Sequence, residues 1–154
     1  MSSLRTPRNA LFTALLVAVA GGGAMTPPDA RGAEPAALNV TFKGIKTPTG
    51  AVMVALFPSE AAYDGKAPGA GQAMLKVGGD AVTATFNGLA PGRYAVKAFH
   101  DVNGDGKLGQ NPFGIPTEPF AFSNNARAMM GPPTWADASF EVKAGANIQT
   151  IEID

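Results

Sequence analysis

The chain has 154 residues, with twelve basic side chains, twelve acidic side chains, one histidine and no cysteine. This length is enough for one domain with a single core, and the balanced charge gives no electrostatic reason to bind nucleic acid or anionic lipid. The absence of cysteine excludes disulfides and thiolate metal sites, so the fold depends on its core for stability.

Residues 1–24 are predicted to be a secretory signal peptide. Arg5 and Arg8 precede an apolar run over residues 10–20, and small residues follow it up to Ala24. The run is too short for a permanent membrane span, so we expect a mature chain without one, exported to the periplasm or out of the cell. Removing residues 1–24 leaves ten basic and twelve acidic side chains, a net charge of −2.

The mature chain has the pattern of an all-β protein. Residues 25–36 are rich in proline and alanine and predict a disordered leader, which leaves residues 37–154 as a single domain. Within this domain, alternating or continuous apolar runs are separated by glycine and proline turns, and they predict seven strands. The strands are expected over residues 38–45, 51–57, 74–77, 82–86, 93–99, 138–142 and 148–153.

The connections between these strands predict the architecture. Short turns favour three hairpins, over residues 38–57, 74–86 and 138–153. Ser59 is expected to cap one helical turn after the first hairpin. Closely spaced strands with almost no helical periodicity predict an antiparallel β-sandwich of about seven strands.

A long segment without a strand pattern, residues 100–135, interrupts the series. It is too apolar for a disordered linker, and we expect an ordered lid across one end of the sandwich. Its large apolar side chains are Phe113, Ile115, Phe120, Phe122, Met129, Met130 and Trp135.

The segment begins with a candidate calcium loop. Residues 101–106 place oxygen-bearing side chains at alternate positions and end on glycine, as a calcium loop requires. Pro112 stands where an EF-hand has its bidentate acid, so the expected site is weak. The equally weighted alternative is a plain turn whose side chains bond their own backbone. The candidate ligands are the side chains of Asp101, Asn103, Asp105 and Glu118 and the backbone carbonyl of Lys107.

Other polar side chains of the segment have functional and structural interpretations. His100 could ligate a metal or act as a base, but a hydrogen bond that fixes the loop is favoured. Ser123 lacks a nucleophile elbow, so we expect no enzyme, and we expect the polar side chains near it to satisfy backbone groups. The candidate ligand-binding residues are His100, Phe122, Ser123, Asn124, Asn125 and Trp135.

Five motifs carry a family resemblance. They are Leu-Ala-Pro-Gly-Arg-Tyr-Ala-Val at 89–96, Phe-His-Asp-Val-Asn-Gly-Asp-Gly-Lys-Leu at 99–108, Gly-Ile-Pro-Thr-Glu at 114–118, Phe-Ser-Asn-Asn-Ala at 122–126 and Gly-Pro-Pro at 131–133. In this order they resemble a family of exported bacterial proteins, the domain of unknown function 2141 family, over about residues 38–153. The resemblance implies a transthyretin-like or immunoglobulin-like sandwich and no established activity. Relatives often carry an acid where this chain has Gly109, which weakens the calcium hypothesis.

Two functions remain open from the sequence. The first is an exported, non-catalytic module whose loop over residues 101–107 binds one calcium ion. The alternative is a periplasmic protein that binds a small ligand or carbohydrate through the aromatic segment 113–135, without metal. The expected partner is a small molecule or a protein, and burial of the rings of Phe120, Phe122 and Trp135 would exclude the alternative.

Overall fold

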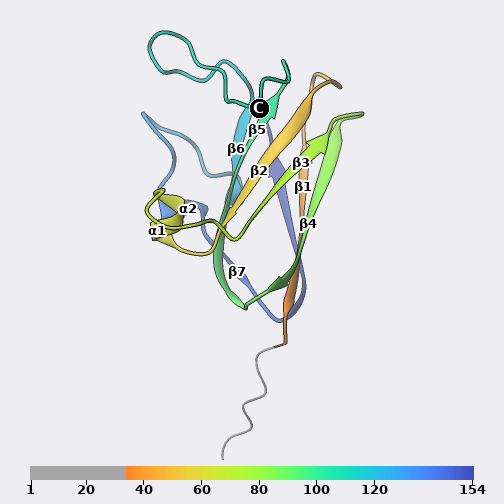
Figure 1. The fold of residues 1–154 in the computed structure, drawn as a ribbon, viewed down its shortest axis with the longest axis vertical. Helices are drawn as coiled ribbons and strands as arrows, with labels where there is room; N and C mark the ends of the chain where they lie inside the picture. The colour runs from red at the N-terminus through yellow and green to blue at the C-terminus, as the bar shows by residue number, and fades with distance from the viewer. Residues whose placement is uncertain (1–33) are drawn as a thin grey trace, which may run out of the picture. The chain divides into compact units, whose positions relative to one another are not determined.

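The computed structural model describes residues 34–154, which form eight strands in two sheets (Figure 1). The predicted signal peptide and residues 25–33 of the predicted leader lie outside the described residues. The first strand begins at Ala36, the last residue that the sequence assigned to the leader, and this side chain is buried. No helix of the described part is long and apolar enough to cross a membrane.

The smaller sheet has three strands in the order β4–β1–β8. β1 (Ala36–Lys43) lies in the middle and pairs antiparallel with β4 (Ala81–Leu89). On its other side β1 pairs parallel with β8 (Gly145–Glu152), so the fold is not antiparallel throughout.

The larger sheet has five strands, four of them in the order β3–β2–β5–β6. These are β3 (Gly71–Lys76), β2 (Ala51–Phe57), β5 (Gly92–Asp101) and β6 (Phe120–Phe122). The fifth strand, β7 (Phe140–Val142), pairs with the beginning of β5. Three short helices complete the domain: α1 (Glu60–Tyr63), η1 (Ser123–Asn125) and α2 (Trp135–Ala138).

The all-β sandwich is confirmed, but the three predicted hairpins are wrong. β1 and β2 belong to different sheets, and so do β3 and β4. β7 pairs with β5 while β8 pairs with β1, so these two strands do not pair either. An alternating pattern gives each strand one buried face whether its neighbour in the chain lies beside it or across the core. The period of two therefore identifies the strands and leaves their partners open.

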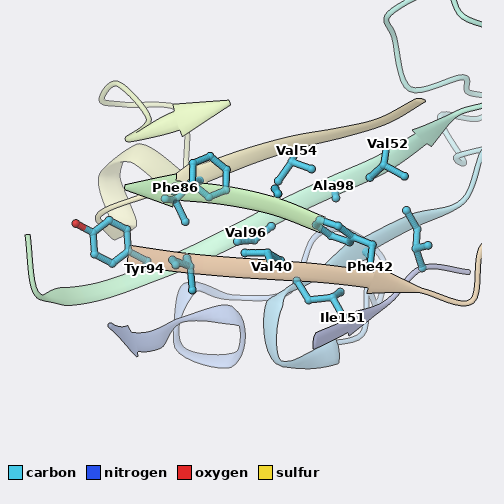
Figure 2. Close-up of a cluster of buried hydrophobic side chains, with 14 of the residues drawn as sticks. Val40, Phe42, Val52, Val54, Phe86, Tyr94, Val96, Ala98 and Ile151 are labelled. Atoms are coloured by element: carbon cyan, nitrogen blue, oxygen red, sulfur yellow. The ribbon is translucent and has the colours of Figure 1, made fainter. Parts of the chain in front are cut away.

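The core lies between the two sheets (Figure 2). Buried and half-buried residues alternate along β1 and β2, as a strand with one core-facing side requires. Figure 2 shows Val40 and Phe42 of β1 facing Val96 and Ala98 of β5 across the sandwich. Phe42 is fully buried, so replacing it with alanine would cost about 3–5 kcal/mol of folding free energy.

Candidate functional site: an apolar groove over the larger sheet

The outer faces of the two sheets differ in polarity. On the smaller sheet, the hydroxyl oxygens of Thr41 and Thr83 lie 3.0 Å apart. Beside them, the Thr85 hydroxyl donates to Asn39 Oδ1 over 2.7 Å. A solvated face of an antiparallel sheet is normally polar in this way. The outer face of the larger sheet instead carries the apolar side chains of Met53, Ala55, Phe57, Phe99, Phe120 and Phe122.

A partly open groove of about 1090 Å³ lies over this apolar face. One wall comes from residues 108–116 of the loop between β5 and β6, and another comes from residues 128–132. Both segments project from the same side of the fold in Figure 1. Ligand sites are typically concave and mostly apolar, with volumes of about 300–1,000 Å³, so this groove has the size and the lining of a binding site.

The rim of the groove is unusually apolar for a solvent-exposed surface. Six large apolar side chains of the described residues are exposed, and four of them line this groove: Met74, Phe113, Ile115 and Met130. Phe113 is 87% exposed. It begins a Phe-Gly-Ile sequence that lies between two prolines. Exposed apolar side chains that gather at one groove are typical of interaction sites.

Lys97 is the single charged residue among those that line the groove. Its Nζ donates a hydrogen bond of 2.6 Å to the backbone carbonyl of Tyr63. The ammonium lies 3.8 Å from the centroid of the Tyr63 ring and 5.2 Å from that of Phe57. Burial lowers the pKa of Lys97 below its ordinary value of 10.5, and the negative charge of Asp64 opposes this shift. Lys97 takes no part in the two ion pairs found in the described residues.

The side chain of Tyr63 is itself held in place. The Ser59 hydroxyl caps α1 as the sequence predicts, by accepting a hydrogen bond from the amide of Ala62. The Tyr63 hydroxyl donates to the carbonyl of Pro133 over 3.0 Å, and its ring packs edge-on against Trp135. Burial raises the pKa of Tyr63 to about 12, and nearby negative charges act in the same direction. α1 therefore anchors both Lys97 and the segment that forms one wall of the groove.

The aromatic residues singled out from the sequence divide between two hollows. Phe120 is half-buried and Phe122 is buried, and both line the main groove. Trp135 is half-buried and lines a smaller hollow beside Tyr63. The segment is not the packed lid that was expected, because Phe113, Ile115, Met129 and Met130 remain exposed. It also contains β6 and η1, and α2 begins at its last residue, three elements that the sequence pattern does not predict.

The candidate calcium loop is held by its own hydrogen bonds. Asp101 Oδ1 accepts from the amides of Gly104 and Asp105 over 2.7 and 3.1 Å, and its Oδ2 accepts from Gly106 over 2.9 Å. Asn103 Oδ1 accepts from the amide of Asp105 over 2.9 Å. Asp105 Oδ1 in turn accepts from the amide of Lys107 over 2.9 Å. These are the bonds that the plain-turn interpretation predicts.

Glu118 joins the two ends of this loop by hydrogen bonds. Its Oε1 accepts from the amide of Val102 and its Oε2 from the amide of Gly109, each over 2.9 Å. A Cβ at Gly109 would lie 2.8 Å from Thr117 Oγ1, so this close approach favours glycine at position 109. Residues 34–154 contain no group of three or more histidine or acidic side chains placed to hold a metal ion.

His100 and Ser123 serve the backbone and do not meet each other. His100 is buried, and its Nε2 donates to the carbonyl of Thr49 over 2.7 Å, which fixes the start of the loop as expected. The fully buried Ser123 hydroxyl accepts from the amide of Val96 over 2.8 Å and donates to the carbonyl of Ala138 over 2.5 Å. In the described residues no hydrogen bond joins the His100 ring to the Ser123 hydroxyl.

Asn124 and Asn125 join the segment after β6 to the rest of the domain. Both adopt left-handed backbone angles, with φ of 59° and 50°, which asparagine tolerates better than most residues. The Asn124 amide donates to the carbonyls of Asp137 and Ser139, each over 3.0 Å. Asn125 Oδ1 accepts from the amide of Glu152 over 2.9 Å. These contacts satisfy backbone groups, as the sequence analysis predicts.

The groove itself was missed from the sequence, although a signal for it was present. Residues 51–57 form a continuous apolar run, which was interpreted as a central strand. β2 is central, but only its even-numbered residues are fully covered, and its other face lines the groove. Lys97 gave no signal, because its environment depends on α1, which is distant in sequence.

Comparison with known proteins places the chain in a family. The family model described as an uncharacterised protein conserved in bacteria, domain of unknown function 2141, matches residues 40–150. The chain belongs to this family. No curated protein and no solved structure matches it.

Proposed function

We propose that this member of an uncharacterised bacterial family is a non-catalytic binding module that holds a small apolar ligand in the groove over the larger sheet. The observation that carries the proposal is the apolar outer face of that sheet, which faces a groove of about 1090 Å³. The outer face of the smaller sheet is mainly polar, with Ile148 as an exposed apolar exception, so the difference is not a general property of the chain. The signal-peptide pattern of residues 1–24 supports a place of action in the periplasm or outside the cell.

The lining favours an apolar ligand over a carbohydrate. A sugar presents many hydroxyl groups, and a site that buries them must supply a partner for each. Three polar side chains line the groove, those of Gln72, Gln110 and Lys97. The aromatic rings therefore act as apolar walls in this proposal, and sugar stacking is the less favoured use.

The polar residues with catalytic potential support the non-catalytic part of the proposal. The buried Ser123 hydroxyl already has backbone partners on two elements. The His100 ring is buried and bonded to a backbone carbonyl. A catalytic pair needs the nucleophile and base within reach of each other and of the substrate.

A neutral apolar dye tests the proposal. Nile red added to the purified protein is expected to bind at one saturable site, with enhanced fluorescence. Met53→Glu places a carboxylate in the groove and is expected to weaken binding at least about tenfold, because the charge must lose water there. Thr41→Glu is the matched control on the outer face of the smaller sheet and is expected to leave binding unchanged. Absence of saturable binding, or equal loss in both variants, would contradict the proposal.

Calcium binding by residues 101–107 is the second candidate. It is favoured by the convergence of Asp101 Oδ1 and Asn103 Oδ1 on the amide of Asp105, which brings oxygens of neighbouring side chains together. An ion that binds only the folded state at a hundred times its dissociation constant adds about 2.7 kcal/mol of stability. Thermal unfolding in chelator and in millimolar Ca²⁺ tests this, with Asp105→Ala as the variant that should lose the effect. An equal midpoint in both conditions would leave the loop as a hydrogen-bonded turn.

A further inference from the structure

We infer that the ligand of the groove is an amphiphilic anion, with its apolar chain on the outer face of the larger sheet and its anionic group at the ammonium of Lys97. This inference rests on the proposed function and names the class of ligand. It is carried by Lys97, which lies between this groove and the smaller hollow, lines both, and is the single charged residue that lines the groove.

The ammonium has hydrogen-bonding capacity left for a ligand. A lysine ammonium has three N–H groups, and one of those of Lys97 donates to the carbonyl of Tyr63. The described residues place no carboxylate in an ion pair with it. Asp64 acts on the ammonium without an ion pair to it and is itself paired with Lys66. An anion that enters the groove would give the half-buried ammonium a direct partner.

The ammonium is also held in a defined position. It lies over the ring of Tyr63, whose hydroxyl is bonded to Pro133, so the ring is not free to turn away. A cation over an aromatic face is attracted by the ring, and a fixed donor reduces the entropy lost when a ligand binds. Lys97 therefore has the features of a preorganised anchor.

The rest of the groove fits an apolar chain. Leu108, Phe113 and Ile115 form the wall that comes from the long loop, and Met53 and Phe99 lie on the sheet. None of these residues carries a polar group at its end. One charged end and an apolar remainder are the features of a fatty acid or of an alkyl phosphate.

Matched ten-carbon probes test this inference through displacement of Nile red. Decanoate is expected to bind about tenfold more tightly than decan-1-ol, because only the anion forms a hydrogen-bonded ion pair with the ammonium. Decyltrimethylammonium is expected to bind more weakly than the alcohol. Decyl phosphate distinguishes a phosphate group from a carboxylate, since the anion that binds more tightly identifies the preferred group.

Substitution of the lysine separates its charge from its shape. Lys97→Met keeps the apolar stem and is expected to remove the preference for decanoate over decan-1-ol. Lys97→Arg is expected to restore the preference. Lys76→Met is the matched control, because Lys76 lies on β3 of the same sheet, is exposed and does not line the groove.

Each result has a distinct meaning. Equal affinity of decanoate and decan-1-ol for the unmodified protein would overturn the inference, even if the Lys97 variants fail to fold. Retention of the preference in Lys97→Met would overturn it as well. Absence of binding by Nile red and by every ten-carbon probe would instead overturn the proposed function on which the inference rests.

Discussion

Glu118 is predicted to stabilise the long loop as a hydrogen-bond acceptor, and Glu118→Gln is the test. The carboxylate joins the two ends of the loop by accepting from the amides of Val102 and Gly109. Glutamine has nearly the same shape but only one acceptor oxygen. Its NH₂ group would face one of the two backbone amides, and this contact would place two hydrogen-bond donors against each other.

The expected loss of folding free energy follows from the two hydrogen bonds of Glu118. One charge-assisted bond is replaced by an unfavourable contact, and the other becomes a neutral bond, at a site that is partly buried. Hydrogen bonds to charged groups contribute about 1.5–3 kcal/mol, and neutral ones about 1 kcal/mol. We therefore expect a loss of about 2 kcal/mol, which lowers the Tm of a domain of this size by about 8 °C.

Thermal unfolding followed by circular dichroism, with chelator present, measures this loss. Glu141→Gln is the control, because Glu141 is exposed on β7 and its single ion pair, with Lys143, is 3.8 Å long. Such surface pairs contribute little, so the control should change stability by less than about 0.5 kcal/mol. Equal, small effects of both substitutions would refute the acceptor role. A loss that Glu118→Gln causes only in the presence of Ca²⁺ would show that Glu118 acts as an ion ligand.

Three further predictions concern buried contacts. Ser123→Ala removes both backbone bonds of a fully buried hydroxyl, so urea unfolding should show a loss of about 2–4 kcal/mol, and a loss below about 1 kcal/mol would contradict this. Gly50→Ala would place a Cβ 2.0 Å from the carbonyl oxygen of Asp101, so it should cost about 3 kcal/mol or more, whereas Gly78→Ala meets open space and should be tolerated. The pKa of Tyr63 is raised from 10.0 to about 12, so the protonated form stabilises the fold. That contribution is complete below pH 10 and is lost as the pH rises to about 12. Urea unfolding across this pH range should show the loss in the wild type but not in Tyr63→Phe, and equal slopes would contradict the assignment.

The sequence predicts the strands better than it predicts their partners. The alternation in residues 38–45 marks β1 because one side of that strand is buried against the core. The same alternation would arise whether β1 paired with β2 or lay across the core from it, so the crossing between sheets is not encoded in the pattern. The parallel pairing of β1 with β8 joins residues more than 100 positions apart, and only the assembled sandwich determines it.

The candidate groove and the segment predicted from the sequence overlap only in part. Aromatic residues of the segment 113–135 do line the groove, as the small-ligand alternative expects. The other half of the groove is the outer face of β2 and β5, and its recognition requires knowing which face of each strand the core covers. Lys97 enters the site through its contact with Tyr63 of α1, a pairing that no local pattern contains.

The polar residues that attracted attention in the sequence have a common structural reason to be there. A long connection without regular sheet or helix leaves many backbone N–H and C=O groups that need partners. Asp101, Glu118, Ser123 and Asn124 each bond two or more such groups, which uses their oxygens and nitrogens within the fold. The exposed apolar side chains at the rim of the groove have no such role, and the ammonium of Lys97 keeps N–H groups beyond its one bond to Tyr63. Exposed apolar side chains that gather at one groove are the feature that the proposed ligand binding explains.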